Sequence, residues 1–136
     1  MEVKHDIGAL LKSLIGISPQ NSAGATINGT GFSRDGFDSC VLVVAAGATT
    51  GAPTSFTVDG KLQSSDAVGG TYADITGAAI TALTAIDTIG NKNVDLGAID
   101  EFIRAVVITA FVGGTAPTVD VAAVVILGGA DVLPAA

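Results

Sequence analysis

Two long apolar runs near the end of the chain constrain its fold more than any other sequence feature. They cover residues 102–112 and 119–127 and consist mainly of valine, isoleucine and alanine. β-Branched residues favour strands, and Gly113, Gly114 and Pro117 between the runs favour a turn, so a long β-hairpin is predicted. Both faces of each run are largely apolar, which is typical of central strands in a sheet with both faces covered. An all-β scaffold is therefore predicted.

Alternation of apolar and polar side chains extends this pattern over most of the chain. Asp59-Gly60 has the composition of a two-residue hairpin turn, but a turn there would leave two very short arms, so one continuous strand is predicted. Further strands are predicted over residues 25–28, 37–46, 55–64, 71–76 and 94–99, and residues 79–89 are predicted to hold a strand and a bend. About eight strands, roughly ten residues apart, are typical of a β-sandwich or jelly roll. We therefore predict a single β-sandwich domain over residues 25–136.

Residues 1–24 are predicted to form a separate N-terminal segment. Apolar side chains in its first fifteen residues recur at helical spacing, while Gly16 and Pro19 would end a helix. A short amphipathic helix packed on the sheet and an extended arm that orders only against a partner both fit this pattern, and a linker over residues 18–24 would let an arm reach away. The candidate partner-binding residues are Ile7, Leu10, Leu11, Leu14 and Ile15.

Charged residues are scarce, which bears on what the surface contacts. Only 14% of the 136 residues are charged and 49% are hydrophobic, whereas about a quarter are charged in an average domain. Such a chain either exposes alanine, glycine, threonine and serine to water or covers much of its surface with partners. Because large obligate interfaces are the more apolar ones, the second alternative is favoured.

The charge balance argues against two classes of partner. The formal net charge is −7, from 13 acidic and six basic residues that form no basic patch, so nucleic-acid binding is not expected. The apolar runs are each too short to span a bilayer, so no membrane insertion is expected. The sequence shows no secretory signal pattern, and the chain is expected to be made or assembled in a cytosol.

The sequence contains no group of residues typical of an active site. His5 is the one histidine, and it has no partner for a catalytic triad or a zinc site. Cys40 lies within an apolar run, where a small buried hydrophobic residue is expected rather than a reactive thiol. The chain is therefore predicted to be no enzyme and to need no cofactor or metal.

Carboxylates were the remaining candidates for chemistry. Asp66 and Asp74 flank a glycine-rich turn, and such a pair can bind calcium together with backbone carbonyls. The dense spacing of a dedicated calcium loop is missing, so roles in the turn and on the surface are favoured. Arg104 is a cation on an otherwise apolar strand, within reach of Asp100 or Asp120 if the predicted hairpin closes. A structural ion pair between Arg104 and Asp120 is predicted.

Four segments together resemble a group of small phage structural proteins. Residues 39–53 form an apolar strand that ends in a loop of small residues. Residues 61–66 are Lys-Leu-Gln-Ser-Ser-Asp, and residues 70–75 are Gly-Thr-Tyr-Ala-Asp-Ile. Residues 102–129 begin with Phe-Ile-Arg-Ala-Val and continue through the predicted final hairpin. This combination, over about residues 37–129, resembles the head decoration or cement proteins of tailed bacteriophages.

The resemblance implies a β-sandwich or jelly roll bound to the outer surface of a phage capsid and assembled in the host cytoplasm. It implies the major capsid protein as partner, self-association as a homodimer or homotrimer, and bridging of neighbouring capsid subunits. Under this hypothesis the N-terminal segment is an arm that grips a neighbour.

Two alternative functions remain open. A tail or head-tail connector component would be another virion role, present in far fewer copies than a decoration protein. A soluble β-sandwich that binds a glycan or calcium is the second alternative. Tyr72 is the one tyrosine and tryptophan is absent, so the aromatic platform on which such sandwiches usually bind sugars is missing.

Overall fold

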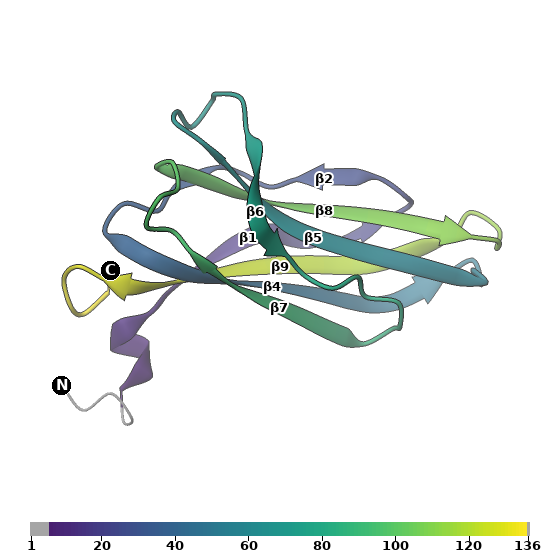
Figure 1. The fold of residues 1–136 in the computed structure, drawn as a ribbon. Helices are drawn as coiled ribbons and strands as arrows, with labels where there is room; N and C mark the ends of the chain where they lie inside the picture. The colour runs from purple at the N-terminus through teal and green to yellow at the C-terminus, as the bar shows by residue number, and fades with distance from the viewer. Residues whose placement is uncertain (1–5, 136) are drawn as a thin grey trace.

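The computed structural model describes residues 6–135 and consists of two antiparallel β-sheets packed face to face (Figure 1). The predicted all-β sandwich is confirmed, with nine strands in the described residues rather than about eight. The elements are η1 (Ile7–Leu10), β1 (Lys12–Ser22), β2 (Thr26–Asn28), β3 (Phe32–Ser33), β4 (Phe37–Thr50), β5 (Ser55–Ser65), β6 (Ala73–Ala79), β7 (Thr88–Asp95), β8 (Phe102–Val112) and β9 (Thr118–Ala130). No helix within residues 6–135 has the length and hydrophobicity needed to cross a membrane.

The strands divide between a sheet A and a sheet B. Sheet A has the order β1-β9-β4-β7, and sheet B has the order β2-β8-β5-β6 with β3 also paired to β8. The predicted continuous strand over residues 55–64 is confirmed, since β5 runs through Asp59 and Gly60 while paired with β8. The strands predicted at 71–76 and 94–99 are displaced, to Ala73–Ala79 and Thr88–Asp95.

The predicted hairpin between residues 102–112 and 119–127 is wrong. Both segments are strands, β8 and β9, but β8 lies between β2 and β5 in sheet B, whereas β9 lies between β1 and β4 in sheet A. The connection contains Gly113 and Gly114, both with positive φ, and it carries the chain from one sheet to the other. Turn composition and period-two alternation are the same for a hairpin and for such a corner, so sequence alone did not distinguish them.

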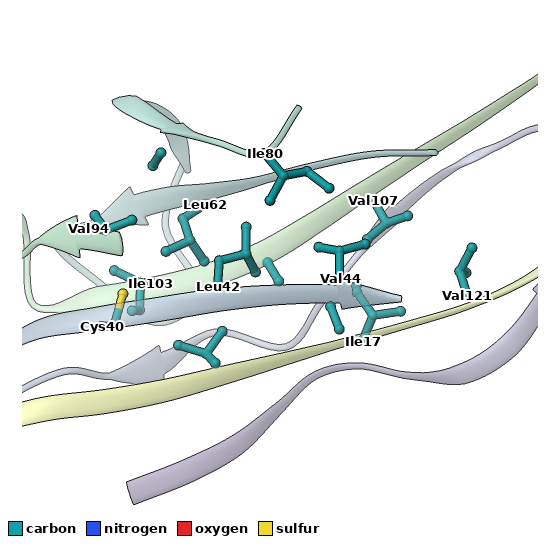
Figure 2. Close-up of a cluster of buried hydrophobic side chains, with 14 of the residues drawn as sticks. Ile17, Cys40, Leu42, Val44, Leu62, Ile80, Val94, Ile103, Val107 and Val121 are labelled. Carbon is teal, nitrogen blue, oxygen red and sulfur yellow. The ribbon is translucent and has the colours of Figure 1, made fainter. Parts of the chain in front are cut away.

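The core fills the space between the two sheets (Figure 2). Leu42 and Val44 of β4, Leu62 of β5 and Ile103 of β8 are inaccessible to solvent. Along most of β4 and β5 every second residue is buried, as the period of two requires. Cys40 is buried in this cluster, as predicted, and burial raises the pKa of its thiol to about 11.

Of the two alternatives for the N-terminal segment, an amphipathic helix through residue 15 is contradicted from Lys12 onward, and within residues 6–11 helical structure is confined to one short turn, η1. Residues 12–22 are instead strand β1, which pairs with the free edge of β9. An isolated helix of this length is marginal in water, whereas pairing with β9 satisfies the backbone groups on one side of β1. The predicted loop over residues 18–24 is likewise mostly strand. Pro19 lies at an irregularity in the β1–β9 register on an edge strand, where a missing N–H is tolerated.

Candidate functional site

A network of polar side chains covers part of the outer face of sheet B. The Asp74 carboxylate on β6 accepts hydrogen bonds from the Gln63 amide (2.8 Å) and the Lys61 ammonium (3.0 Å), both on β5. The other end of Gln63 accepts two hydrogen bonds, of 2.9 and 2.8 Å, from the Arg104 guanidinium on β8. These contacts join three neighbouring strands through cross-strand side-chain pairs.

Tyr72 extends this network to the loop between β5 and β6. The Arg104 guanidinium lies 4.4 Å from the centre of the Tyr72 ring, a cation–π contact. The Tyr72 hydroxyl donates a hydrogen bond to the Val68 carbonyl oxygen at 2.8 Å. The loop is thereby fastened to the sheet. Gln63, Tyr72 and Arg104 come from three of the segments that carried the resemblance, so the fold brings those segments together at one place.

The predicted ion pair between Arg104 and Asp120 does not form. Arg104 lies on sheet B, whereas Asp120 lies on sheet A and accepts a hydrogen bond from the Asn21 amide at 2.9 Å. The prediction assumed that β8 and β9 are neighbours in one sheet. The ion pair that the structure shows within residues 6–135 is Lys61–Asp74. Sequence analysis had placed Asp74 near Asp66 and missed Lys61 as its partner. The pairing of β5 with β6 brings Lys61 and Asp74 together.

The Asp74 contacts predict a dependence of stability on pH. The hydrogen bonds from Gln63 and then from Lys61 lower the pKa of the Asp74 carboxyl in the folded chain. Its contribution to stability is therefore present above its unfolded pKa of about 3.9 and is lost as the pH falls through the lower folded value. Asp74→Asn is expected to reduce the free energy of unfolding at pH 7, and this difference from wild type is expected to shrink below about pH 4.

Urea denaturation from pH 7 to pH 2.5 measures this effect. Asp59→Asn is the matched control because it removes one exposed carboxylate from the neighbouring strand, β5, without touching the network. A wild-type to Asp74→Asn difference that stays constant over the whole pH range would contradict the assignment.

The five predicted partner-binding residues do not share one face. Ile7 in η1 and Ile15 in β1 are 67% and 65% exposed, whereas Leu14 is partly buried and packs on the core. Leu11 lines a hollow on the outer side of sheet A, and Leu10 is partly buried. The helical spacing that grouped them does not apply, because residues 12–15 belong to a strand.

Exposed apolar side chains gather where the two ends of the described chain meet. The Ala135 N–H donates a hydrogen bond to the Ala9 carbonyl at 2.7 Å, which holds the C-terminal segment beside η1 (Figure 1). We call Ile7, Val132 and Leu133 the terminal cluster; Val132 is 78% exposed. Asp6 and Asp131, next to these residues in sequence, are exposed as well. Exposed apolar side chains of this size, with acidic residues next to them in sequence, make this end of the molecule a candidate protein interface.

The outer face of sheet A is the second apolar surface. Its rows follow the strand register: Ile15 pairs with Val124, which pairs with Val43. In the adjacent row Ala122 pairs with Ala45, which pairs with Ile89. We call the following eight residues the sheet A face: Ile15, Val41, Val43, Ala45, Ile89, Ala122, Val124 and Ile126. All are partly or fully exposed.

Among residues 6–135, no three His, Cys, Asp or Glu side chains lie close enough together to hold a metal ion. The chemistry that these surfaces offer is apolar burial and hydrogen bonding to other macromolecules. His5 lies outside the described residues.

Comparison with known proteins finds structures with a similar fold but no protein family that matches the sequence. No protein-family model matches the sequence, and no curated protein is similar to it in sequence. Among solved structures, a chain of the infectious bursal disease virus Gx strain superposes with a TM-score of 0.56 at 14% identity, over 91% of this chain and 34% of that one. A chain of the VP2 subviral particle of the same virus gives a TM-score of 0.53 at 13% identity, over 86% and 32%.

A third structure is the SPBc2 prophage-derived protein YomS. The two chains superpose over 85% of this chain and 92% of YomS, at 14% identity and a TM-score of 0.48. The chain thus spans about a third of the length of the two virus chains and most of YomS. At these identities the likeness to the two virus chains shows a shared fold and nothing finer.

Proposed function

We propose that this chain is a structural protein of a virus particle that decorates and cements a bacteriophage capsid, binding major capsid protein subunits and bridging neighbours on the outer surface. The terminal cluster is the observation that carries the proposal. It presents Ile7, Val132 and Leu133 to solvent at one end of a rigid sandwich, with acidic residues beside them. The sandwich fold shared with two virus-particle chains supports the same function.

The resemblance to decoration proteins gains support from the polar network on sheet B. Arg104 lies far from Gln63 and Tyr72 in the sequence, yet it contacts both of them directly. A recurring sequence pattern with that physical role maintains a fold and a fastened loop rather than a reaction. We accordingly propose a structural and not a catalytic function, with assembly onto the particle in the host cytoplasm.

The terminal cluster is suited to cementing because its contribution per copy is modest. Full burial of an aliphatic side chain stabilises a contact by about 1.5–3 kcal/mol, and ordering the terminal residues offsets part of that gain. A shell that carries many copies multiplies such contacts without new chemistry. The neighbouring acidic residues, Asp6 and Asp131, fit a partner surface that is apolar in the centre and basic at its edge.

Cosedimentation with capsids tests the proposal. Shells assembled from the major capsid protein encoded in the same genome are expected to bind the purified chain at saturation, and electron microscopy of those shells is expected to show ordered, symmetric copies on the outside. Copy number separates the alternatives, since a tail or connector component would be limited to a dozen or so sites. Shells that bind no chain would contradict the proposal.

Substitutions in the terminal cluster locate the contact. The double variant Ile7→Asp, Val132→Asp is expected to weaken capsid binding about 100-fold or more, because each carboxylate would lose water in the contact without a designed partner. Val68→Asp, an exposed position on the β5–β6 loop, is the matched control and is expected to bind as wild type does. Equal binding by the double variant and the control would place the capsid contact elsewhere.

A further inference from the structure

The sheet A face differs from the rest of the surface because its eight residues carry no charge. The chain as a whole has a net charge of −7, yet the carboxylates nearest to this face, Asp95 and Asp120, lie at its opposite ends. On sheet B, by contrast, Lys61, Asp74 and Arg104 project outward and contact one another or Gln63. Two acidic molecules approach each other at the lowest electrostatic cost through an uncharged face.

A raised row of side chains and two hollows lie next to one another on this face. The row of Ile15, Val124 and Val43 forms a ridge across the sheet, with Ile15 being 65% and Val124 36% exposed. A hollow of about 490 Å³ lies on one side of the ridge, lined by Leu11, Val41, Asn93, Asp95, Ile126 and Gly128 among others. A hollow of about 420 Å³ lies on the other side, lined by the small residues Ala45, Gly47 and Ala122 and also by Asp120, Gln20 and Asn21.

We propose that the sheet A face binds the same face of a second copy of this chain. In a two-fold dimer the same patch serves both partners, so a surface with a ridge beside a hollow can place each ridge in the other copy's hollow. In such a dimer the two facing sheets would lie about 10 Å apart with their side chains interdigitated, as the two sheets of a sandwich do. The inference rests on the proposed function as a decoration protein, because the resemblance to that group implies self-association as a homodimer or homotrimer.

The whole outer side of sheet A, of which the sheet A face is the apolar part, is close to the area of a standard interface. With strands about 4.8 Å apart and about 3.3 Å per residue, the lengths of β1, β9, β4 and β7 give roughly 700 Å² of sheet, from 11, 13, 14 and 8 residues. A standard interface buries about 800 Å² per partner. The terminal cluster shares no residue with the sheet A face.

Analytical ultracentrifugation of the purified chain tests the inference. Wild type is expected to sediment as a dimer at about 10 µM. Val124→Asp, in the centre of the ridge, is expected to raise the dissociation constant at least 100-fold, because the carboxylate would be buried without a partner. Val112→Asp is the matched control, because Val112 is also an exposed valine on a strand, 63% accessible, but lies on β8 of sheet B. This variant is expected to remain a dimer.

Ile15→Lys provides a second variant on the edge strand in case Val124→Asp disturbs folding, which circular dichroism would reveal. It too is expected to give monomers. Wild-type monomers at 100 µM, an oligomer of higher order, or folded variants that remain dimeric would each overturn the inference. Capsid cosedimentation of the same variants distinguishes a failure of this inference from a failure of the proposed function. If Val124→Asp is monomeric and still binds shells, the proposed function is upheld. If the wild-type chain is a dimer that binds no shells, the proposed function alone is contradicted.

Discussion

Replacing Leu42 with alanine is expected to lower the free energy of unfolding by about 2–5 kcal/mol. Leu42 is fully buried on β4, a strand with a paired neighbour on each side, and it belongs to the same buried cluster as Leu62 and Ile103. Its removal leaves a cavity between two sheets whose strands are fixed by their hydrogen bonds, so the surroundings collapse only partly. A domain of this size is stable by only about 5–15 kcal/mol.

Urea denaturation at a fixed protein concentration measures the loss, because self-association would otherwise change the apparent stability. Val112→Ala is the control: it shortens an exposed side chain on a central strand and is expected to change the free energy by no more than about 0.5 kcal/mol. A loss below about 1 kcal/mol for Leu42→Ala would show that the two sheets do not enclose this side chain.

The strands were predictable because their signal is local. Alternation along residues 37–46 and 55–64 predicted β4 and β5 within a few residues at each end, since a half-buried strand repeats every two residues whatever it pairs with. The burial of Cys40 followed from the same pattern.

The pairing of strands was not predictable, because it depends on contacts far apart in sequence. β8 and β9 follow each other directly, yet they lie in different sheets. The prediction of an Arg104–Asp120 ion pair was wrong for that reason. The observed partner of Arg104 is Gln63, which is 41 residues away in sequence and lies on the neighbouring strand. Knowing that β5 lies between β6 and β8 would have revealed the whole polar network.

The candidate interaction surfaces were found only in part. Ile7 and Ile15 were predicted as partner-binding residues and both are exposed, but they lie on separate surfaces. Val132 and Leu133 were missed because nothing in their local sequence indicates that the C-terminal segment returns to η1, where Ala135 bonds to Ala9. The sheet A face was missed because its residues come from four strands whose order the sequence does not state.

Gly29 provides the second large effect, and it tests whether β1 belongs to the sandwich. Gly29 follows β2, and its N–H donates a hydrogen bond to the Ala105 carbonyl of β8 at 2.7 Å. A Cβ at this position would lie 2.1 Å from the Gly16 carbonyl oxygen of β1 and 2.9 Å from the Ala105 carbonyl oxygen. Both obstacles are backbone atoms, so no side-chain rotation relieves them.

Gly29→Ala is therefore expected to destabilise the chain by about 3 kcal/mol, at the upper end of the usual overpacking range, or to displace β1 from β9. Thermal unfolding compares it with Gly69→Ala, whose added Cβ meets nothing within 4 Å and which is expected to stay within about 0.5 kcal/mol of wild type. Hydrogen exchange shows which response occurs, because a displaced β1 loses protection while β4 keeps it. If both alanine variants unfold at the wild-type temperature, residues 12–22 do not lie against β2 and β8, and the N-terminal segment is an arm that orders only against a partner.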